Sequence, residues 1–348
     1  MKEAEAKYNL PEFIQKKHDW VKVQRTLDKE QSTFKEIPTV YPRIYQLEPT
    51  NNCNLACVMC PRSEITRPIG NMPMELFNRI VTQELDRPQA IELFGFGESL
   101  LHPNIAEMIR TLKDNGHYVV LATNGTVLTE EMSEKIVRAG LDFCVLDVDG
   151  DNKEVYEKVR RKGNYEQVEK NVKRFLKVKG SCFAVVQTIL MQETSQTNMN
   201  NYRKEWLEAG ADEIRVKFLD TFAGSVMVEE EKVAKQERKN FLNLKDNKER
   251  LPCPELFHGV DVWQDGTVVP CGRYWDASYP LGKIGEKSLK EIWEDEPARK
   301  LRELQLSRDW KGLVEIGAKR CAVCEECDLT NLRFLDDITN NMFRGQYL

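Results

Sequence analysis

Between residues 44 and 219, short runs rich in β-branched and aromatic residues alternate with amphipathic stretches of helical period. This alternation predicts repeated βα units, in which buried parallel strands are followed by helices that cover them. The expected strands are Ile44–Pro49, Ala90–Phe96, Tyr118–Thr123, Phe143–Val148, Phe183–Leu190 and Glu213–Leu219. The expected helices are Glu75–Leu85, Ile105–Asn115, Glu130–Ala139, Tyr165–Lys177 and Asn201–Ala209. The pattern therefore predicts an α/β fold built as a complete or partial barrel.

The segments that flank this region have a different pattern. Residues 1–40 are charged and weakly periodic, which predicts an N-terminal extension with one short helix. A polar, helix-forming stretch precedes Leu251, and the chain then becomes rich in Gly, Trp and Cys with short elements. The predicted division is an extension (1–40), a barrel (41–228), a linker helix (229–250), a second domain (251–334) and a C-terminal tail (335–348).

Composition limits where the chain works and what it binds. Of the 348 residues 41% are hydrophobic, and no apolar stretch approaches the roughly 20 residues of a membrane span. The N-terminus has no apolar secretory signal, which favours the reducing cytoplasm, so the ten cysteines call for a role other than disulfides. The net charge of −5 is spread along the chain without a basic stripe. Neither a membrane nor nucleic acid is an expected partner.

Three cysteines follow the first expected strand directly, at positions 53, 57 and 60. Soft thiolates this close together in a cytosolic chain suit iron–sulfur or zinc coordination better than packing. A structural zinc ion takes four protein ligands, whereas this CxxxCxxC spacing supplies three and would leave one iron of a [4Fe-4S] cluster open. The spacing favours a cluster at Cys53, Cys57 and Cys60, with zinc or a purely structural role as the alternative.

This loop resembles the cluster-binding loop of the radical S-adenosylmethionine (SAM) superfamily, which follows the first strand of a partial (β/α)6 TIM barrel. The resemblance implies that SAM chelates the open iron and is cleaved by one electron to methionine and a 5′-deoxyadenosyl radical. It also implies an electron donor of the flavodoxin or ferredoxin type. Met59 stands where many members carry an aromatic residue near the adenine, and its polarizable thioether can fill the same place.

Later loops resemble further motifs of the superfamily, each after an expected strand. The segment 95–98, Gly-Phe-Gly-Glu, resembles the GGE motif that binds the SAM amino group, and the segment 123–125, Thr-Asn-Gly, resembles a polar motif near the methionyl or ribose groups. Asp147 replaces a Ser common in relatives, and Arg160 lies where many relatives place an arginine that contacts SAM. Ordinary turns and surface positions are the alternatives. The residues expected to contact SAM are Met59, Gly97, Glu98, Thr123, Asn124, Asp147 and Arg160.

The cysteines beyond residue 250 predict a second metal site. They are Cys253, Cys271, Cys321, Cys324 and Cys327. A strand, a Gly turn and a second strand form an expected hairpin that ends at Cys271, and a Ser-Leu-Lys-Glu-Ile-Trp helix follows at 288–293. This pattern resembles the SPASM and twitch auxiliary-cluster domains of radical SAM enzymes.

Five cysteines are fewer than the seven or so that a full SPASM domain uses, so the count favours the twitch version with one auxiliary [4Fe-4S] cluster. The expected ligands are Cys253, Cys271 and two of the terminal three, with Cys324 and Cys327 favoured over Cys321. Zinc is the alternative at this site too. The remaining pair, Cys144 and Cys182, lies in apolar strands and is expected in the core.

The resemblance implies hydrogen abstraction from a substrate. Relatives with one auxiliary cluster include dehydrogenases and epimerases of aminocyclitols and sugars, which favours oxidation of a small polar molecule. An epimerase and a peptide maturase are alternatives, and about 40 residues before the barrel are too few for a leader-peptide domain. An electron carrier without SAM chemistry is a remote alternative. The candidates for substrate contact or acid–base chemistry are Arg215, Lys217, Asp220, Arg273, Tyr274, His102 and His258, with Cys321 as a candidate hydrogen-atom donor.

Overall fold

The computed structural model describes residues 41–191, 193–194, 197–220, 222 and 253–316. Within these ranges nine strands form one sheet in the order β6-β5-β4-β3-β2-β1-β7-β8-β9. The strands are β1 (Arg43–Leu47), β2 (Ala90–Glu92), β3 (Tyr118–Thr123), β4 (Phe143–Asp147), β5 (Phe183–Leu190), β6 (Glu213–Phe218), β7 (Gly259–Val262), β8 (Thr267–Val269) and β9 (Gly282–Lys283). Strands β1 to β6 are parallel, as expected for βα units.

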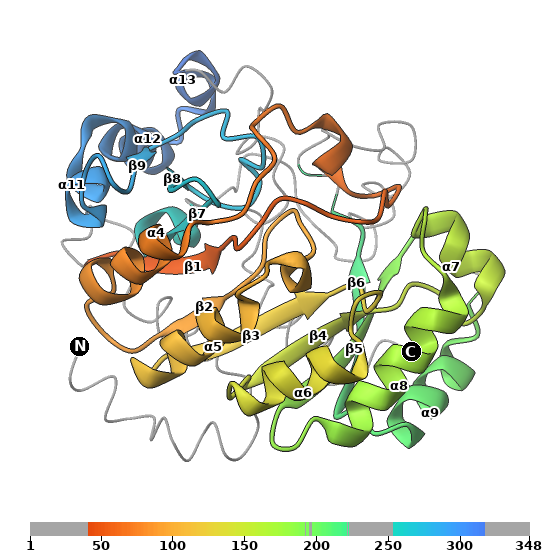
Figure 1. Ribbon diagram of the computed structural model, residues 1–348. Helices are drawn as coiled ribbons and strands as arrows, with labels where there is room; N and C mark the ends of the chain where they lie inside the picture. Colours follow the sequence, from red (N-terminus) through yellow and green to blue (C-terminus); the bar gives the residue numbers. More distant parts are fainter. Residues whose placement is uncertain (1–40, 192, 195–196, 221, 223–252, 317–348) are drawn as a thin grey trace, which may run out of the picture.

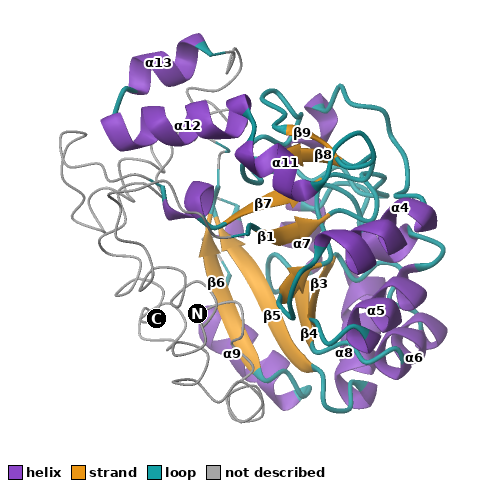
Figure 2. Ribbon diagram, turned by 90° about the vertical axis from the view of Figure 1, so that its left-hand side faces the viewer, coloured by secondary structure: helices purple, strands orange, loops and turns teal. Residues whose placement is uncertain are grey.

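The helices that connect the parallel strands lie together on one side of the sheet (Figures 1 and 2). They are α4 (Met74–Arg79) with the π-helical turn η2 (Ile80–Glu84), α5 (Ile105–Asp114), α6 (Glu130–Arg138), α7 (Lys153–Val159), α8 (Tyr165–Val178) and α9 (Met199–Glu208). Side-chain caps begin several of them, since Thr129, Asn164 and Asn198 each accept a bond from the backbone of the first turn. These parts form the partial (β/α)6 barrel of the predicted fold class.

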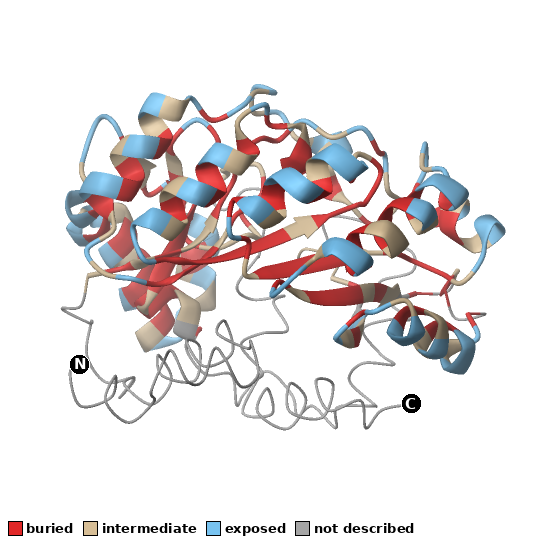
Figure 3. Cartoon of the chain, turned by 60° about the horizontal axis from the view of Figure 1, so that its bottom comes forward, coloured by how far each residue is buried: buried red, intermediate tan, exposed pale blue. Residues whose placement is uncertain are grey.

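The two faces of the sheet have different cores. Alternate strand residues such as Val119, Leu121 and Leu146 pack against the helices in the larger core, which also contains the buried Cys144 and Cys182. The predicted core position of both cysteines is confirmed. The opposite face carries a smaller apolar cluster of Ala90, Tyr118, Val120, Phe143, Val145 and Val185. Figure 3 shows the strands buried beneath helices whose outer sides are exposed. The smaller cluster forms the floor of the barrel interior.

The C-terminal part of the chain continues the same sheet rather than folding apart from it. Strand β7 pairs with β1 in parallel, and β8 and β9 follow as antiparallel strands. The short turn η6 (Pro254–Phe257) precedes β7, and the helices α11 (Leu289–Glu294), α12 (Glu296–Ser307) and α13 (Trp310–Glu315) follow β9. A capping box of Ser288 and Glu291 begins α11. We call residues 253–316 the cap.

Several boundaries differ from the prediction. Strand β2 ends at Glu92 instead of Phe96, because the glycine-rich segment after it turns towards the end of β1. The helix expected over Glu75–Leu85 changes to a π-helical turn at Ile80, and α7 was not predicted. The expected linker helix, the extension and the tail lie outside the described residues. No helix of the described residues is long and apolar enough to cross a membrane.

Candidate active site

Loops at the carboxyl ends of the strands, which include the short turns η1 (Pro61–Glu64) and η3 (Ser99–Leu101), surround the first three cysteines. The loop after β1 carries Cys53, Cys57 and Cys60, and its backbone is fixed to the end of α7. Ala56 N–H donates to the carbonyl of Arg161 at 3.0 Å, and Val58 N–H donates to that of Val159 at 3.0 Å. The turn η1 (Pro61–Glu64) follows Cys60 at once. The strand order therefore places the cysteine loop beside the loops from β2, β3 and β4.

The surroundings of these three thiols suit thiolate ligands. All three are free and partly buried. At Cys53 the Sγ lies 3.5 Å from the Leu55 N–H and 3.8 Å from Nδ2 of Asn124, and at Cys57 the Sγ lies 3.9 Å from Nη1 of Arg160. Donors at these positions stabilise negative charge on sulfur.

Burial disfavours the charged form of the thiols when no metal is present. It raises the pKa of Cys53 and Cys57, and it raises the pKa of Cys60 to about 12. Thiolates at these positions need a cation, which iron supplies. No group of three His, Cys, Asp or Glu side chains in the described ranges is arranged to hold a metal ion. A [4Fe-4S] cluster binds each cysteine through a separate iron, so its ligands need not meet at one point. The donor set fits such a cluster.

Met59, expected near the adenine, is buried at 6% exposure. It packs with Val159, Met191 and Leu219, and the partly buried Cys57 adjoins this apolar group. The thioether thus lies between the cysteine loop and the ends of the later strands.

Glu98 joins the second and third loops. Its carboxylate accepts bonds from Oγ1 of Thr123 and the N–H of Asn124, both at 2.8 Å, and from the N–H of Leu100 at 3.2 Å in the turn η3 (Ser99–Leu101). The side chain is 2% exposed, and burial raises its pKa to about 7. Both oxygens are thus engaged within the protein. Binding of the SAM amino group by Glu98 stays a prediction.

Gly97 allows the second loop to lie against the cysteine loop. A Cβ atom at this position would be 2.2 Å from the carbonyl oxygen of Thr50, a contact that no side chain tolerates. The N–H of Glu98 donates to the carbonyl of Asn52 at 2.8 Å, directly before Cys53. Gly97 therefore fits the role of a backbone element next to the cluster, and its contact with SAM stays a prediction.

The Thr123–Asn124 segment is more than a turn. Nδ2 of Asn124 reaches Oδ1 of Asn54 at 3.1 Å as well as the Cys53 sulfur, and Thr123 Oγ1 contacts Glu98. Nδ2 of Asn171 on α8 holds the loop by donating to the carbonyls of Gly125 and Thr126. The structure thus brings Asn124 to the cysteine loop directly and Thr123 to Glu98 beside it.

Arg160 connects the fourth strand with the cysteine loop. Its Nε donates to Asp149 at 2.6 Å, its Nη2 lies 3.8 Å from Asp147, and its Nη1 faces the Cys57 sulfur. Asp149 is fully buried and also accepts a bond from the Ile189 N–H. Sequence reasoning selected Asp147 and missed Asp149. The alternating Asp-Val-Asp pattern was its only signal, because two residues on one face of a strand end can share one arginine.

A row of polar side chains lies on the same face of the sheet as the smaller apolar cluster, nearer the carboxyl ends of the strands. Asp147, Gln187 and Arg215 are register partners on β4, β5 and β6, and Gln187 Nε2 donates to Asp147 at 2.9 Å. Burial raises the pKa of Asp147. The Arg215 guanidinium lies 5.8 Å from the Phe143 ring centroid, and Lys217 follows on the same face as an exposed residue. These residues face away from the helices.

The cap meets the barrel at the end of β6. Asp220 and Nη2 of Arg273 form an ion pair at 2.7 Å, so the structure brings these two candidates together. Cys271 lies two residues before Arg273, partly buried against Trp263 and Tyr274. Tyr274 is 2% exposed and belongs to the cap core, and its carbonyl accepts a bond from the Trp263 indole.

The other second-site cysteines differ in what the structure describes. Cys253 is 6% exposed, and its N–H donates to Oε1 of the buried Gln305 at 3.1 Å. The three predicted terminal positions, Cys321, Cys324 and Cys327, lie outside the described residues.

The two candidate histidines, His102 and His258, make their hydrogen bonds with segments other than the cysteine loop. Nε2 of His102 pairs with the Met72 carbonyl at 3.0 Å and its Nδ1 accepts from Asn104, and burial lowers its pKa. His258 closes η6, and its carbonyl accepts from the N–H of Arg43 at the start of β1.

Comparison with known proteins identifies the class that this arrangement defines. Residues 47–197 match the Radical SAM superfamily model, and residues 253–328 match SPASM, an iron–sulfur cluster-binding domain. The chain thus carries a radical SAM domain followed by a C-terminal SPASM domain. It is therefore a radical SAM enzyme. Its cofactors are SAM with a [4Fe-4S] cluster in the radical SAM domain and auxiliary iron–sulfur cluster content in the SPASM domain.

Individual relatives differ in what they act on. The chain is 26% identical over 330 residues to the AdoMet-dependent heme synthase of Methanosarcina barkeri, covering 81% of this chain and 91% of that protein. It matches the structure of BtrN in complex with AdoMet and 2-DOIA with a TM-score of 0.52 and 15% identity, over 82% and 94% of the two chains. It also matches Streptococcus suis SuiB bound to the precursor peptide SuiA with a TM-score of 0.61 and 14% identity, over 80% and 70%. The two structures share the fold with this chain.

Proposed function

We propose that this enzyme removes a hydrogen atom from a small polar substrate, of the sugar or aminocyclitol kind, and oxidises it by two electrons. When bound, the cofactors would supply the redox chemistry: SAM and its cluster would provide the group that abstracts the hydrogen atom, and one auxiliary [4Fe-4S] cluster would accept the second electron as the substrate loses a proton. Cys53, Cys57 and Cys60 would hold the first cluster. Cys253, Cys271 and two of Cys321, Cys324 and Cys327 would hold the second.

The observation that carries the substrate class is the polar row beside the cysteine loop. Asp147, Gln187 and Arg215 offer a carboxylate, an amide and a guanidinium on one face of the sheet. Arg160 reaches both Asp147 and Cys57, so it connects this row with the proposed cluster. Groups of these kinds bind hydroxyl, amino and carboxylate substituents and fix their orientation. Two relatives also favour a small molecule: the heme synthase is named for one, and the BtrN structure contains 2-DOIA.

The residues of the chain would orient the reactants and exclude water. Glu98 holds the loops from β2 and β3 together, and Asn124 and Arg160 direct N–H groups at the sulfurs of Cys53 and Cys57. The Asp220–Arg273 ion pair holds the cap against the end of β6, where it would close the interior. We propose the cytoplasm as the compartment and a flavodoxin- or ferredoxin-type protein as the electron donor.

The first experiment tests SAM cleavage. Anaerobically reconstituted enzyme with SAM and dithionite is expected to form 5′-deoxyadenosine, and the variant with Cys53, Cys57 and Cys60 all changed to Ala is expected to form none. That variant should keep roughly four irons in its second site. Continued 5′-deoxyadenosine formation by the triple variant would show that the assignment of the ligands is wrong.

The second experiment separates the reaction types once a substrate is found. A product two hydrogens lighter supports oxidation. Solvent deuterium at an inverted carbon, lost when a non-ligand cysteine such as Cys321 is changed, would instead show an epimerase. A modified peptide as the product would overturn the assignment to small polar substrates.

A further inference from the structure

A fully buried carboxylate follows β1 and gathers three separate segments of the chain. Glu48, at 0% exposure, accepts bonds from both terminal nitrogens of Arg67, at 2.6 and 2.9 Å. It also accepts from the N–H of Phe96 at 2.9 Å and the N–H of Gln264 at 3.2 Å. Phe96 precedes Gly97 and Glu98, and Gln264 belongs to the turn between β7 and β8. One side chain thus joins the loop after the cysteines, the loop after β2 and the cap.

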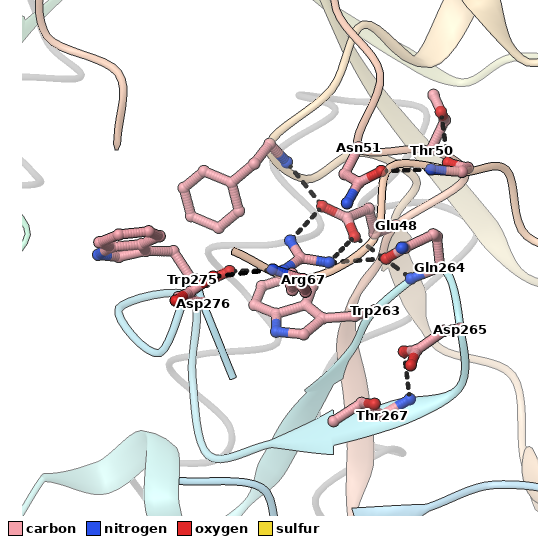
Figure 4. A network of polar contacts seen from close by, with 12 residues as sticks. Glu48, Thr50, Asn51, Arg67, Trp263, Gln264, Asp265, Thr267, Trp275 and Asp276 are labelled. Atoms are coloured by element: carbon pink, nitrogen blue, oxygen red, sulfur yellow. Dashed lines mark hydrogen bonds and ion pairs between the residues drawn. The ribbon is translucent and has the colours of Figure 1, made fainter. Parts of the chain in front are cut away.

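Arg67, the partner of Glu48, also contacts the cap. Besides the two bonds to Glu48, its Nη1 donates to Oε1 of Gln264 at 2.6 Å and its Nε donates to the carbonyl of Trp275 at 2.7 Å. Its guanidinium carbon lies 4.8 Å from the Trp263 ring centroid (Figure 4). A planar group with donors on three sides and a stacked face is specific to arginine, and lysine cannot reproduce it.

The cap in turn holds the segment that contains Arg67. Asp276 accepts bonds from the N–H and hydroxyl of Thr66, at 2.6 and 2.7 Å, and from the N–H of Arg67 at 3.3 Å. Gln264 Nε2 donates to the Pro68 carbonyl at 2.9 Å. We call Glu48, Arg67, Gln264 and Asp276 the junction.

Aromatic side chains also pack the loop after β2 against the cap. The Phe96 ring meets the Trp263 ring edge-on at 5.6 Å, and Trp263 packs in the cap cluster beside Cys271. Gly95 has no room for a side chain, since a Cβ there would lie 2.5 Å from Cγ of Glu48. The loop after β2 is therefore held closely against both the junction and the cap.

We propose that the junction positions the SAM-binding loop and the auxiliary-cluster hairpin relative to each other, so that SAM binding and the packing of the cap are coupled. Glu48 and Arg67 are positioning residues, because they act on SAM through Phe96, Gly97 and Glu98. The inference rests on the proposed function, in which that loop binds SAM. Coupling must work in both directions, so SAM should also tighten the hairpin at Gln264 and Asp276.

Two substitutions test the coupling from its two ends. Arg67→Lys keeps the cation and removes the planar fork, and Asp276→Asn weakens the contacts from the cap, far from the expected SAM contacts. Both variants should hold wild-type iron and sulfide and bind SAM at least fivefold more weakly in equilibrium binding. Lys283→Gln is the matched control, because Lys283 on β9 pairs with Asp265 in the turn between β7 and β8 and its side chain is 42% exposed. It should bind SAM as the wild type does.

Hydrogen exchange provides a readout that a merely structural role would not change. In the wild type, added SAM should slow exchange of amides at residues 259–276, and this slowing should be lost in Arg67→Lys and Asp276→Asn. SAM affinity within twofold of wild type in both variants, or loss of iron from both, would overturn the inference. Failure of the wild type itself to bind SAM would instead count against the proposed function.

Discussion

Asp149 and Arg160 form an ion pair beside the cysteine loop with almost no exposure to solvent, at 0% and 8% for the two side chains. Asp149→Ala would leave the Arg160 charge buried with the longer contacts to Asp147 and to the Cys57 sulfur. We expect this change to lower the free energy of unfolding by about 3–5 kcal/mol. Chemical denaturation under anaerobic conditions measures it.

The matched control is an exposed pair on α6. Glu134 lies 3.1 Å from Arg138, and both side chains are about half or more exposed, at 47% and 65%. Glu134→Ala should change the free energy of unfolding by less than about 0.5 kcal/mol. Equal effects of the two substitutions would mean that the buried Asp149–Arg160 pair stabilises the protein no more than an exposed ion pair does.

The free energy of unfolding is expected to depend on pH through the titration of Glu98. Its folded-state pKa, raised from 4.5 to about 7 by burial, means that the folded protein binds the proton more tightly than the unfolded chain does. The protonated form therefore contributes stability at low pH that is lost as the pH rises from 4.5 to about 7. The loss is about 1.4 kcal/mol per pH unit within that window.

Glu98→Gln isolates this contribution, because glutamine keeps the shape and does not titrate. Unfolding of the reconstituted proteins between pH 6 and 8 should show the wild type losing stability relative to the variant up to about pH 7 and running parallel above it. Parallel curves over the whole range would contradict the shifted pKa of Glu98.

At the scale of elements, the sequence predicted strand bounds best where the apolar pattern within a single strand is enough to mark them. The bounds of β3 and β5 agree with the prediction, because each is a run rich in apolar and β-branched residues with Gly or polar residues within three positions of both ends. The short α7 was missed, since its seven residues make only about two helical turns, and Asn152 as its cap is a weak signal.

Contacts between distant segments could not be predicted in this way. The motifs after β1, β2, β3 and β4 indicated the positions of the cysteine loop, Glu98 and Arg160. Nothing local marks Glu48 as the partner of Arg67 and Gln264, since Gln264 lies 197 residues beyond Arg67. Such pairs depend on how β7 joins β1, which is a property of the tertiary fold.

The pairing of β7 with β1 predicts that the barrel is not stable by itself. A chain that ends at residue 252 would lose β7 and expose the edge of β1 together with the apolar side chains that Val260 and Val262 cover. We expect it to aggregate on expression, because an open apolar strand edge pairs with other chains. Recovery of a monomer with a cooperative unfolding transition would show that residues 41–252 fold independently.

At the scale of the whole molecule, the two cysteine sets predict about eight irons per chain. Changing Cys253 and Cys271 together to Ala should reduce the content of reconstituted protein to about four irons and leave SAM cleavage measurable, because the proposed ligands of the SAM cluster are Cys53, Cys57 and Cys60. Iron and sulfide analysis checks both values. Four irons in the wild type would exclude an auxiliary cluster, and about twelve would imply a full SPASM arrangement.

The position of β1 inside the sheet has a consequence for synthesis on the ribosome. Gln46 of β1 donates its N–H to Asp261 of β7, which lies 215 residues later in the chain. At a translation rate of roughly 5–20 residues per second, β1 waits on the order of 10–40 s for this neighbour. During that interval the nascent barrel has an unfilled edge next to the cysteine loop. A chaperone that binds open strand edges would therefore act on this edge of β1 until β7 has been made and covers it.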